Sequence, residues 1–292
     1  MLTVLIPTYN YNSLNLVKEL HEQLIKSNIS FEIICIDDGS KSKLNKYNQE
    51  INFLTCSSFI ELKENIGRSA IRNLLSKKAK YKWLLFLDSD VFPTSTNFIS
   101  NYVKEMEIGN DPIYLGGIAY ENDITCSLLR CKMGKKNEEK PVFIRKKKPY
   151  KYFFTANFLI KKIIFDTINF NESLLKYGYE DLLFSKELKK NRIDIKHLDN
   201  AVYHLGIDEN KDFLNKTKAA LENLTYLIMC NHILKKDTQI SKMFYKLETY
   251  KIVSFLAIFH SIFERIADKK SSLFFYNLFR LTYLHKILKN SK

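Results

Sequence analysis

Residues 83–93 have the sequence WLLFLDSDVFP, in which five apolar residues are followed at once by Asp88, Ser89 and Asp90. An uninterrupted apolar run of this length predicts a strand buried in a sheet. If the strand geometry continues one step past Leu87, both carboxylates point to the same side, because residues two apart on a strand share a face. Two like charges this close repel each other unless a proton or a cation separates them.

This pattern at a strand end predicts a site for a hard divalent cation. Mg²⁺ and Mn²⁺ prefer carboxylate and phosphate oxygens, and Mg²⁺ is usually held by one or two carboxylates together with substrate phosphates. The alternative is a plain turn, in which Asp88 and Asp90 accept hydrogen bonds from nearby backbone N–H groups.

Strands and helices are predicted to alternate around this stretch. We expect strands at 3–7, 31–36, 59–62 and 83–87 and helices at 13–26, 69–78 and 94–106. This order predicts βαβ units, and so an α/β fold with a mostly parallel sheet and helices on both faces. Acidic residues follow several of the strands, and ligands of open α/β sheets bind at the carboxyl ends of the strands.

The rest of the chain has two different patterns. Further strands are predicted at 112–118, 152–160, 193–198 and 200–205, with one helix at 180–190. From about residue 210 the apolar residues have helical spacing, and helices are predicted at 213–234, 242–266 and 271–288. We therefore expect an α/β domain over 1–209 and a helical C-terminal region over 210–292.

Positive charge is concentrated in the second part of the chain. Residues 1–125 hold 13 Lys/Arg and 15 Asp/Glu, whereas residues 126–292 hold 33 and 17, and the whole chain has a net charge of +14. A basic half is typical of a protein with an anionic partner, such as nucleic acid, phospholipid or a phosphorylated substrate. Solvated lysines without any partner explain the same charge equally well.

Cysteines and terminal segments indicate the compartment. The five cysteines form no C-x-x-C pair, which predicts reduced thiols in a cytoplasmic protein and no zinc site. The start MLTVLIP resembles no signal peptide, and no stretch has the roughly 20 apolar residues of a membrane span. Residues 272–292, SLFFYNLFRLTYLHKILKNSK, have two interpretations: a core helix, or a helix lying on the inner face of an anionic membrane.

Two more stretches predict polar sites near the same edge of the sheet. EIICIDDGS places Asp37 and Asp38 at the end of a strand, before a glycine and a serine that permit a tight turn. ENIGRSAIRN places Gly67 before a helix, with Arg68 and Arg72 four residues apart on one helical face. A helix N-terminus combined with arginine suits an anion, although a solvated basic face has the same pattern.

Five motifs in order carry a family resemblance: VLIPTYN, IICIDDGS, ENIGRSAIRN, WLLFLDSDVFP and YGYEDLLFSKEL. Over about residues 1–205 the chain resembles a bacterial family 2 glycosyltransferase of the GT-A fold. The resemblance implies a Rossmann-like domain with a nucleotide-binding half at 1–119 and an acceptor half at 120–209. It also implies a nucleotide-sugar donor, most often a UDP-sugar, a divalent metal and inversion at the anomeric carbon.

The resemblance also implies roles for individual residues. Glu180 and Asp181 resemble the acidic pair of the family, with Asp181 as the catalytic base, although acids at a helix N-terminus are also favoured by the helix dipole. Thr155 and Ala156 stand where the family is usually richer in glycine. Donor-side positions correspond to Pro7, Thr8, Tyr9, Asp38, Gly67, Arg68, Arg72, Asp88 and Ser89, and metal ligands to Asp90 and His204.

The implied reaction transfers a sugar to a hydroxyl of a glycan or lipid-linked acceptor, as in surface polysaccharide or glycolipid synthesis. Two other functions share some of these features. A sugar-phosphate nucleotidyltransferase needs a glycine-rich triphosphate loop after the first strand, but PTYNYNSLN contains no glycine. A non-catalytic protein that binds membrane or nucleic acid leaves the ordered acidic motifs unexplained, so we expect no nucleic-acid partner.

Overall fold

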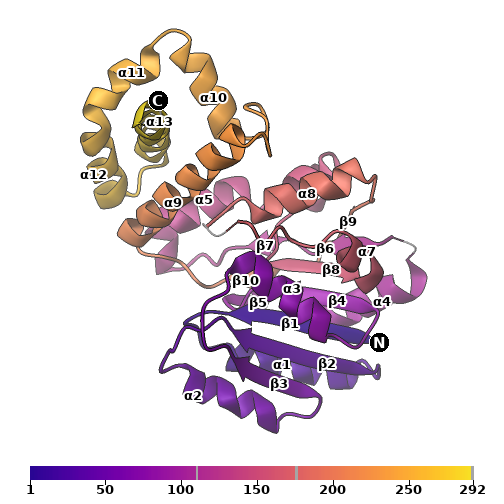
Figure 1. Ribbon diagram of the computed structural model, residues 1–292. Helices are drawn as coiled ribbons and strands as arrows, with labels where there is room; N and C mark the ends of the chain where they lie inside the picture. Colours follow the sequence, from indigo (N-terminus) through magenta and orange to yellow (C-terminus); the bar gives the residue numbers. More distant parts are fainter. Residues whose placement is uncertain (110, 175–176, 291–292) are drawn as a thin grey trace. The chain divides into compact units, whose positions relative to one another are not determined.

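The computed structural model describes residues 1–109, 111–174 and 177–290 (Figure 1). The chain forms two compact units. The sheet unit comprises the described residues of 1–121, 138–175 and 180–206, and the helical unit comprises those of 122–137, 176–179 and 207–292. The helical unit therefore includes two short segments that lie before residue 207 in the sequence.

The sheet unit is built on a seven-stranded sheet in the order β3-β2-β1-β4-β8-β6-β9. β1 to β4 are parallel neighbours, β8 is antiparallel to β4 and β6, and β9 is parallel to β6. The predicted mostly parallel sheet is thus confirmed. The strands are β1 (Leu2–Thr8), β2 (Phe31–Asp37), β3 (Ser57–Glu61), β4 (Trp83–Leu87), β6 (Ile113–Leu115), β8 (Asn157–Lys161) and β9 (Lys196–His197).

A second, three-stranded sheet lies in the order β5-β10-β7. It consists of β5 (Val91–Pro93), β7 (Ile118–Ala119) and β10 (Val202–His204). β10 runs antiparallel to β5, with His204 opposite Val91. Since β5 follows directly on Asp90, this pairing brings the end of the sheet unit back to the turn between β4 and β5.

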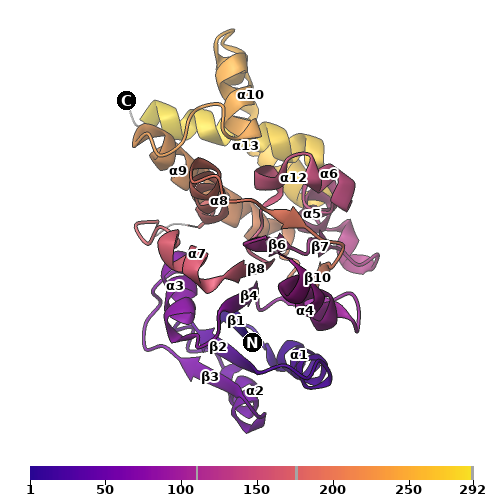
Figure 2. The same cartoon turned by 90° about the vertical axis from the view of Figure 1, so that its right-hand side faces the viewer.

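Helices cover both faces of the large sheet, as predicted. Figure 2 shows α3 and α7 on one side of the strands and α1 and α4 on the other. The α-helices of this unit are α1 (Leu14–Lys26), α2 (Asn45–Asn48), α3 (Arg68–Lys78), α4 (Phe98–Ile108), α6 (Val142–Lys146), α7 (Lys162–Thr167) and α8 (Glu180–Lys190), and its 3-10 helices are η1 (Gln49–Phe53) and η3 (Pro149–Tyr152).

Aromatic side chains fill the core on the α3–α7 side of the sheet. Phe86 of β4 stacks on Phe158 of β8, with ring centroids 4.7 Å apart, and Phe165 of α7 stacks on Phe86 at 4.9 Å. Phe170 and Phe184 stack at 4.3 Å and belong to the same cluster. Because Phe184 lies on α8, this cluster fixes the helix that carries Glu180 and Asp181.

The helical unit is arranged around α13 (Leu273–Asn290), which Figure 1 shows along its axis with α10, α11 and α12 around it. Phe279, Leu281 and Leu284 of α13 are buried, so the structure supports core packing for residues 273–290. Among the described residues, no helix is long and apolar enough to cross a membrane. The other elements are η2 (Ile124–Ser127), α5 (Leu129–Asn137), α9 (Asn210–Met229), α10 (Gln239–Glu248), α11 (Ile252–Leu256), η4 (Ala257–Phe259) and α12 (His260–Lys270).

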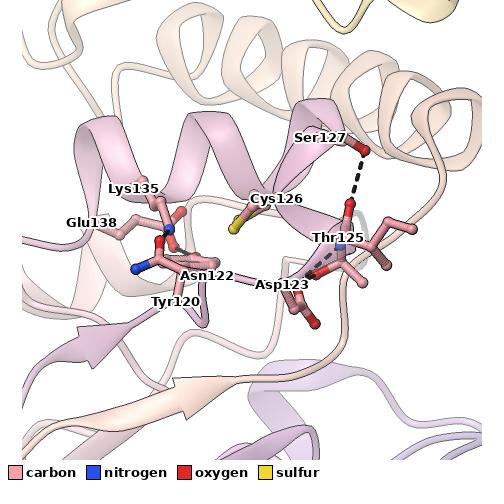
Figure 3. The surroundings of a disulfide bond; sticks show 10 residues. Tyr120, Asn122, Asp123, Thr125, Cys126, Ser127, Lys135 and Glu138 are labelled. Carbon is pink, nitrogen blue, oxygen red and sulfur yellow. Dashed lines mark hydrogen bonds between the residues drawn. A yellow bond between two sulfur atoms is a disulfide. The ribbon is translucent and has the colours of Figure 1, made fainter.

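A disulfide joins Cys126 and Cys131 in the helical unit (Figure 3), so the prediction that all five cysteines are reduced was wrong. The chain turns between η2 and α5, and this turn brings the two Cα atoms to 5.0 Å. That separation is within the range of about 4.4–6.8 Å that a disulfide requires. The five-residue spacing alone does not reveal such a turn, in which the Leu128 N–H donates to the carbonyl of Thr125 at 2.9 Å.

The aromatic cluster provides a test of the fold. Phe158→Ala removes a fully buried ring from the central sheet and should lower the free energy of unfolding by about 3–5 kcal/mol, since the cavity cannot close completely. Phe53→Ala is the control, because Phe53 is 87% exposed and its loss should change the free energy by at most about 0.5 kcal/mol. Equal effects in urea denaturation would contradict this description of the core.

Candidate active site

Arg72 lies at the centre of the polar network in the sheet unit. Its guanidinium, on α3, is only 3% exposed, and its Nη2 donates to Oδ1 of Asp88 at 2.6 Å and to Oγ1 of Thr155 at 3.2 Å. Its Nη1 lies 3.9 Å from Oε1 of Glu180 and donates to the carbonyl of Arg68. One buried cation therefore joins the end of β4, the residues before β8 and the start of α8.

Asp88 and Asp90 lie in a turn between β4 and β5. The strand ends at Leu87 and does not continue one step further, the possibility considered from the sequence. The turn gives the carboxylates different partners: Asp88 pairs with Arg72, whereas Oδ2 of Asp90 lies 3.9 Å from Nε2 of His204. Burial raises the pKa of Asp88, but Arg72 and Arg68 outweigh it, and the net pKa is lowered. The pKa of Asp90 is raised, because burial and the charge of Asp88 outweigh His204.

Backbone pairing places His204 beside Asp90. The Leu205 N–H donates to the carbonyl of Asp90 at 2.8 Å, directly after the β5–β10 pairing. The ring of Tyr120 stacks on His204 with centroids 5.7 Å apart, and its hydroxyl donates to Glu138. A Cβ built on Gly206 would lie 2.1 Å from Oδ2 of Asp90, so only glycine at this position leaves room for that oxygen.

Asp90 and His204 have the chemistry and spacing to share a metal ion. Two atoms each about 2.1 Å from one ion lie at most about 4.2 Å apart, and the 3.9 Å between Oδ2 and Nε2 satisfies this limit. No group of three or more His, Cys, Asp or Glu side chains suited to a metal occurs in the described part of the chain. The pair could thus supply two ligands to one divalent ion at this point of the sheet unit.

Glu180 and Asp181 open α8 but have different surroundings. Oε1 of Glu180 lies 3.5 Å from Nη1 of Arg68 and close to Arg72, so its charge is balanced. Burial and the neighbouring charge of Glu180 raise the pKa of Asp181 to about 7. The Leu182 N–H donates to Asp181 at 2.7 Å, and this bond opposes the shift only in part. Asp181 is therefore able to take up a proton near neutral pH, as a general base must.

The other predicted donor residues occupy the ends of β1 and β2 and the start of α3. Asp38 accepts from the N–H groups of Ile66 at 2.7 Å and Gly67 at 3.0 Å, so it fixes the loop before α3. Gly67 has a φ of 91°, a conformation that favours glycine. Arg68 is half exposed, and Ser89 lies in the turn between the two aspartates.

The three predicted donor residues at the end of β1 differ in exposure. Pro7 is partly buried, and Tyr9 after the strand is 58% exposed. Thr8 is buried, and its hydroxyl is hydrogen-bonded to Ser13 at 3.1 Å and to Cys35 at 3.0 Å. The Thr8 side chain therefore faces the interior, and its carbonyl accepts the Asp38 N–H at 2.8 Å.

Sequence reasoning missed four residues that shape this site: Tyr11, Tyr120, Glu138 and Gly206. Burial and the charge of Asp90 raise the pKa of Tyr11, and the charge of Glu138 contributes to the raised pKa of Asp181. Tyr11 had a signal, since it lies in the PTYNYN stretch that follows β1. Tyr120, Glu138 and Gly206 reach the site only through tertiary contacts that no local pattern reveals.

A comparison with protein families matches residues 3–183 to the model described as Glycosyl transferase family 2. The chain belongs to this family. The match covers the motifs from β1 to the start of α8 and ends before His204.

Curated relatives within the family are similar over part of their length. The chain is 29% identical over 124 residues to a chondroitin synthase of Pasteurella multocida, which is 41% of this chain and 12% of that protein. It is 35% identical over 98 residues to an uncharacterized glycosyltransferase of Mycoplasma genitalium, which is 30% of this chain and 32% of that protein. The chain thus spans a third or less of either relative.

Solved structures show the same GT-A architecture. A mannosyltransferase from Pyrobaculum calidifontis, in complex with GDP-Man and Mn²⁺, has a TM-score of 0.55 at 12% identity, with 100% of this chain and 88% of that one covered. S. aureus TarS in complex with UDP has a TM-score of 0.51 at 16% identity, with 99% and 91% covered. At these identities the likeness establishes the fold alone.

The raised pKa of Asp181 leads to a stability test. The pKa is higher in the folded protein than the usual 3.8, so folding favours the protonated acid; this stability is fully present below about pH 3.8, is lost as the pH rises from there, and is gone above about pH 7. Asp181→Asn should therefore raise the melting temperature at pH 8, and raise it clearly less at pH 5, where only part of the cost has developed. Asp166→Asn, at an exposed carboxylate, should show no such pH dependence. A lower melting temperature of Asp181→Asn at pH 8 would contradict the assignment.

Proposed function

We propose that this protein transfers a sugar, with inversion at the anomeric carbon, from a UDP-sugar to a hydroxyl of a glycan or lipid-linked acceptor. The observation that carries the proposal is the position of Arg72, which holds Asp88 of the D-x-D turn and Glu180 beside Asp181 on one guanidinium. That arrangement supports a diphosphate site beside a candidate base, as a single displacement requires. Family membership supports sugar transfer as the reaction class.

In this proposal the donor lies along the carboxyl edge of β1, β2 and β4. Tyr9 offers an exposed ring to the nucleoside, and the loop that Asp38 holds brings Gly67 and Arg68 to the base and phosphates. Asp88, kept charged by Arg72, faces the ribose. The complexes of TarS with UDP and of the archaeal mannosyltransferase with GDP-Man are consistent with a nucleotide-sugar donor.

Asp90 and His204 would hold Mn²⁺ or Mg²⁺. The bound ion supplies Lewis-acid stabilisation of the charge that develops on the departing diphosphate. In the protein without a bound ion, burial and the charge of Asp88 raise the pKa of Asp90. Both also favour the binding of a cation at this carboxylate.

Asp181 would act on the acceptor side. Its carboxylate removes the proton of the acceptor hydroxyl as that oxygen attacks the anomeric carbon from the face opposite the diphosphate, which inverts the configuration. A pKa of about 7 makes it a stronger base than an ordinary aspartate. With a lipid-linked acceptor, the reaction would take place in the cytoplasm at the inner face of the membrane.

Ligand binding tests the metal pair. UDP together with Mn²⁺ should raise the melting temperature of the wild-type protein more than either alone, because binding to the folded state stabilises it. Asp90→Asn and His204→Gln should abolish most of the Mn²⁺-dependent part, whereas His232→Gln, at an exposed histidine of the helical unit, should retain it. Absence of any nucleoside-diphosphate binding by the wild type would refute the proposal.

The pH dependence of transfer tests the base. Because Asp181 must be deprotonated to act, the rate should fall about tenfold per pH unit below about pH 7 and level off above it. Asp181→Asn should lower the rate by about 10²–10⁴-fold while leaving the UDP–Mn²⁺ shift in melting temperature in place. A variant with the wild-type rate would exclude Asp181 as the base.

A further inference from the structure

The segment from α11 through η4 to α12 exposes a row of large apolar side chains. They are spaced three or four residues apart, so they share one side of the helical path. We call this row and its flanking cations the α11–α12 face. Its apolar members, with exposed fractions of 40–75%, are Ile252, Phe255, Ile258, Phe259 and Ile262.

The opposite side of the same segment packs into the helical unit. Val253, Phe263 and Ala267 are buried there. The exposed row is therefore not part of the core of the helical unit, because other residues of the segment form its buried side. An exposed set of five large apolar residues needs another explanation, since such patches mark interaction sites.

Positively and negatively charged side chains lie on different sides of the same segment. Arg265 and Lys269 continue the three- and four-residue spacing from Ile262, and Lys251 and Lys270 lie at the two ends, all of them exposed. The acid Glu264 points the other way, with its Oε1 2.5 Å from Nζ of Lys218 on α9. The exposed side is thus apolar and cationic, and its acidic neighbour faces inward.

We propose that the α11–α12 face docks on the anionic surface of a lipid bilayer. Apolar side chains that enter the headgroup region, flanked by lysine and arginine, are what such a surface binds. A second copy of this chain is a poorer occupant, because a two-fold interface would bring the four exposed cations of one copy against those of the other, and besides Glu264 α12 has one partly exposed acid, Asp268, to set against them. The purpose of the docking, access to a lipid-linked acceptor, rests on the proposed function, but the docking itself needs no sugar transfer.

Co-sedimentation of the full chain with vesicles tests this. The protein should pellet with vesicles of equal parts phosphatidylglycerol and phosphatidylcholine, far less with phosphatidylcholine alone, and less as salt is added. The double variant Phe255→Ser/Ile258→Ser should bind the mixed vesicles about tenfold more weakly, because it loses two apolar side chains that enter the interface. Its melting temperature should be unchanged, since both side chains are exposed.

The matched control is Phe143→Ser/Ile163→Ser in the sheet unit. Phe143 is 63% and Ile163 73% exposed, close to the 64% of Phe255 and the 75% of Ile258, and lysines lie near both in the sequence. This control should bind like the wild type. Equal loss in both double variants, or no pelleting of the wild type, would overturn the proposal. So would a dimer in sedimentation without lipid that only Phe255→Ser/Ile258→Ser dissociates.

The proposed sugar transfer and the proposed membrane docking can be refuted independently of each other. Asp181→Asn should pellet with mixed vesicles like the wild type although it transfers sugar about 10²–10⁴-fold more slowly, and Phe255→Ser/Ile258→Ser should still show the UDP–Mn²⁺ shift in melting temperature. Loss of nucleotide binding in the wild type with intact vesicle binding would refute only the proposed reaction. Intact nucleotide binding by the wild type without vesicle binding would refute only the docking surface.

Discussion

The buried guanidinium of Arg72 is the interaction on which the site depends. A cation that is 97% buried is costly unless its charge is matched, and here Asp88 and Glu180 supply the match from two different elements. The pairing explains why β4 can end in a carboxylate next to a core of stacked phenylalanines. The two members of the Glu180–Asp181 pair have different surroundings: Glu180 lies beside Arg68 and Arg72, whereas burial and the charge of Glu180 raise the pKa of Asp181.

The turn between β4 and β5 separates the roles of its two aspartates. Asp88 is held on Arg72 and its pKa is lowered, whereas Asp90 faces His204 and Gly206 and its pKa is raised. The same turn is fixed from the far end of the sheet unit, because β10 pairs with β5. Two segments more than 100 residues apart in the sequence thus define one small polar site.

Sequence patterns predicted those features of the fold that depend on residues close together in the chain. The bounds of β4 and α8 were predicted correctly, since an apolar run without breaks and an acidic helix start are local signals. Long-range contacts were not predictable in this way: the stacking of Tyr120 on His204, the inward hydroxyl of Thr8 bonded to Ser13 and Cys35, and the turn that joins Cys126 to Cys131. Of the two interpretations of the C-terminal segment, the structure supports core packing, because Phe279, Leu281 and Leu284 of α13 are buried.

In the proposed mechanism, Asp90 and His204 hold a divalent ion against the diphosphate of the donor. Anomalous diffraction from crystals grown with UDP and Mn²⁺ measures this directly. A manganese peak is expected within about 2.3 Å of both Oδ2 of Asp90 and Nε2 of His204, with the diphosphate oxygens completing its coordination. A manganese peak on other residues, or UDP bound away from the β4–β5 turn, would contradict this mechanism.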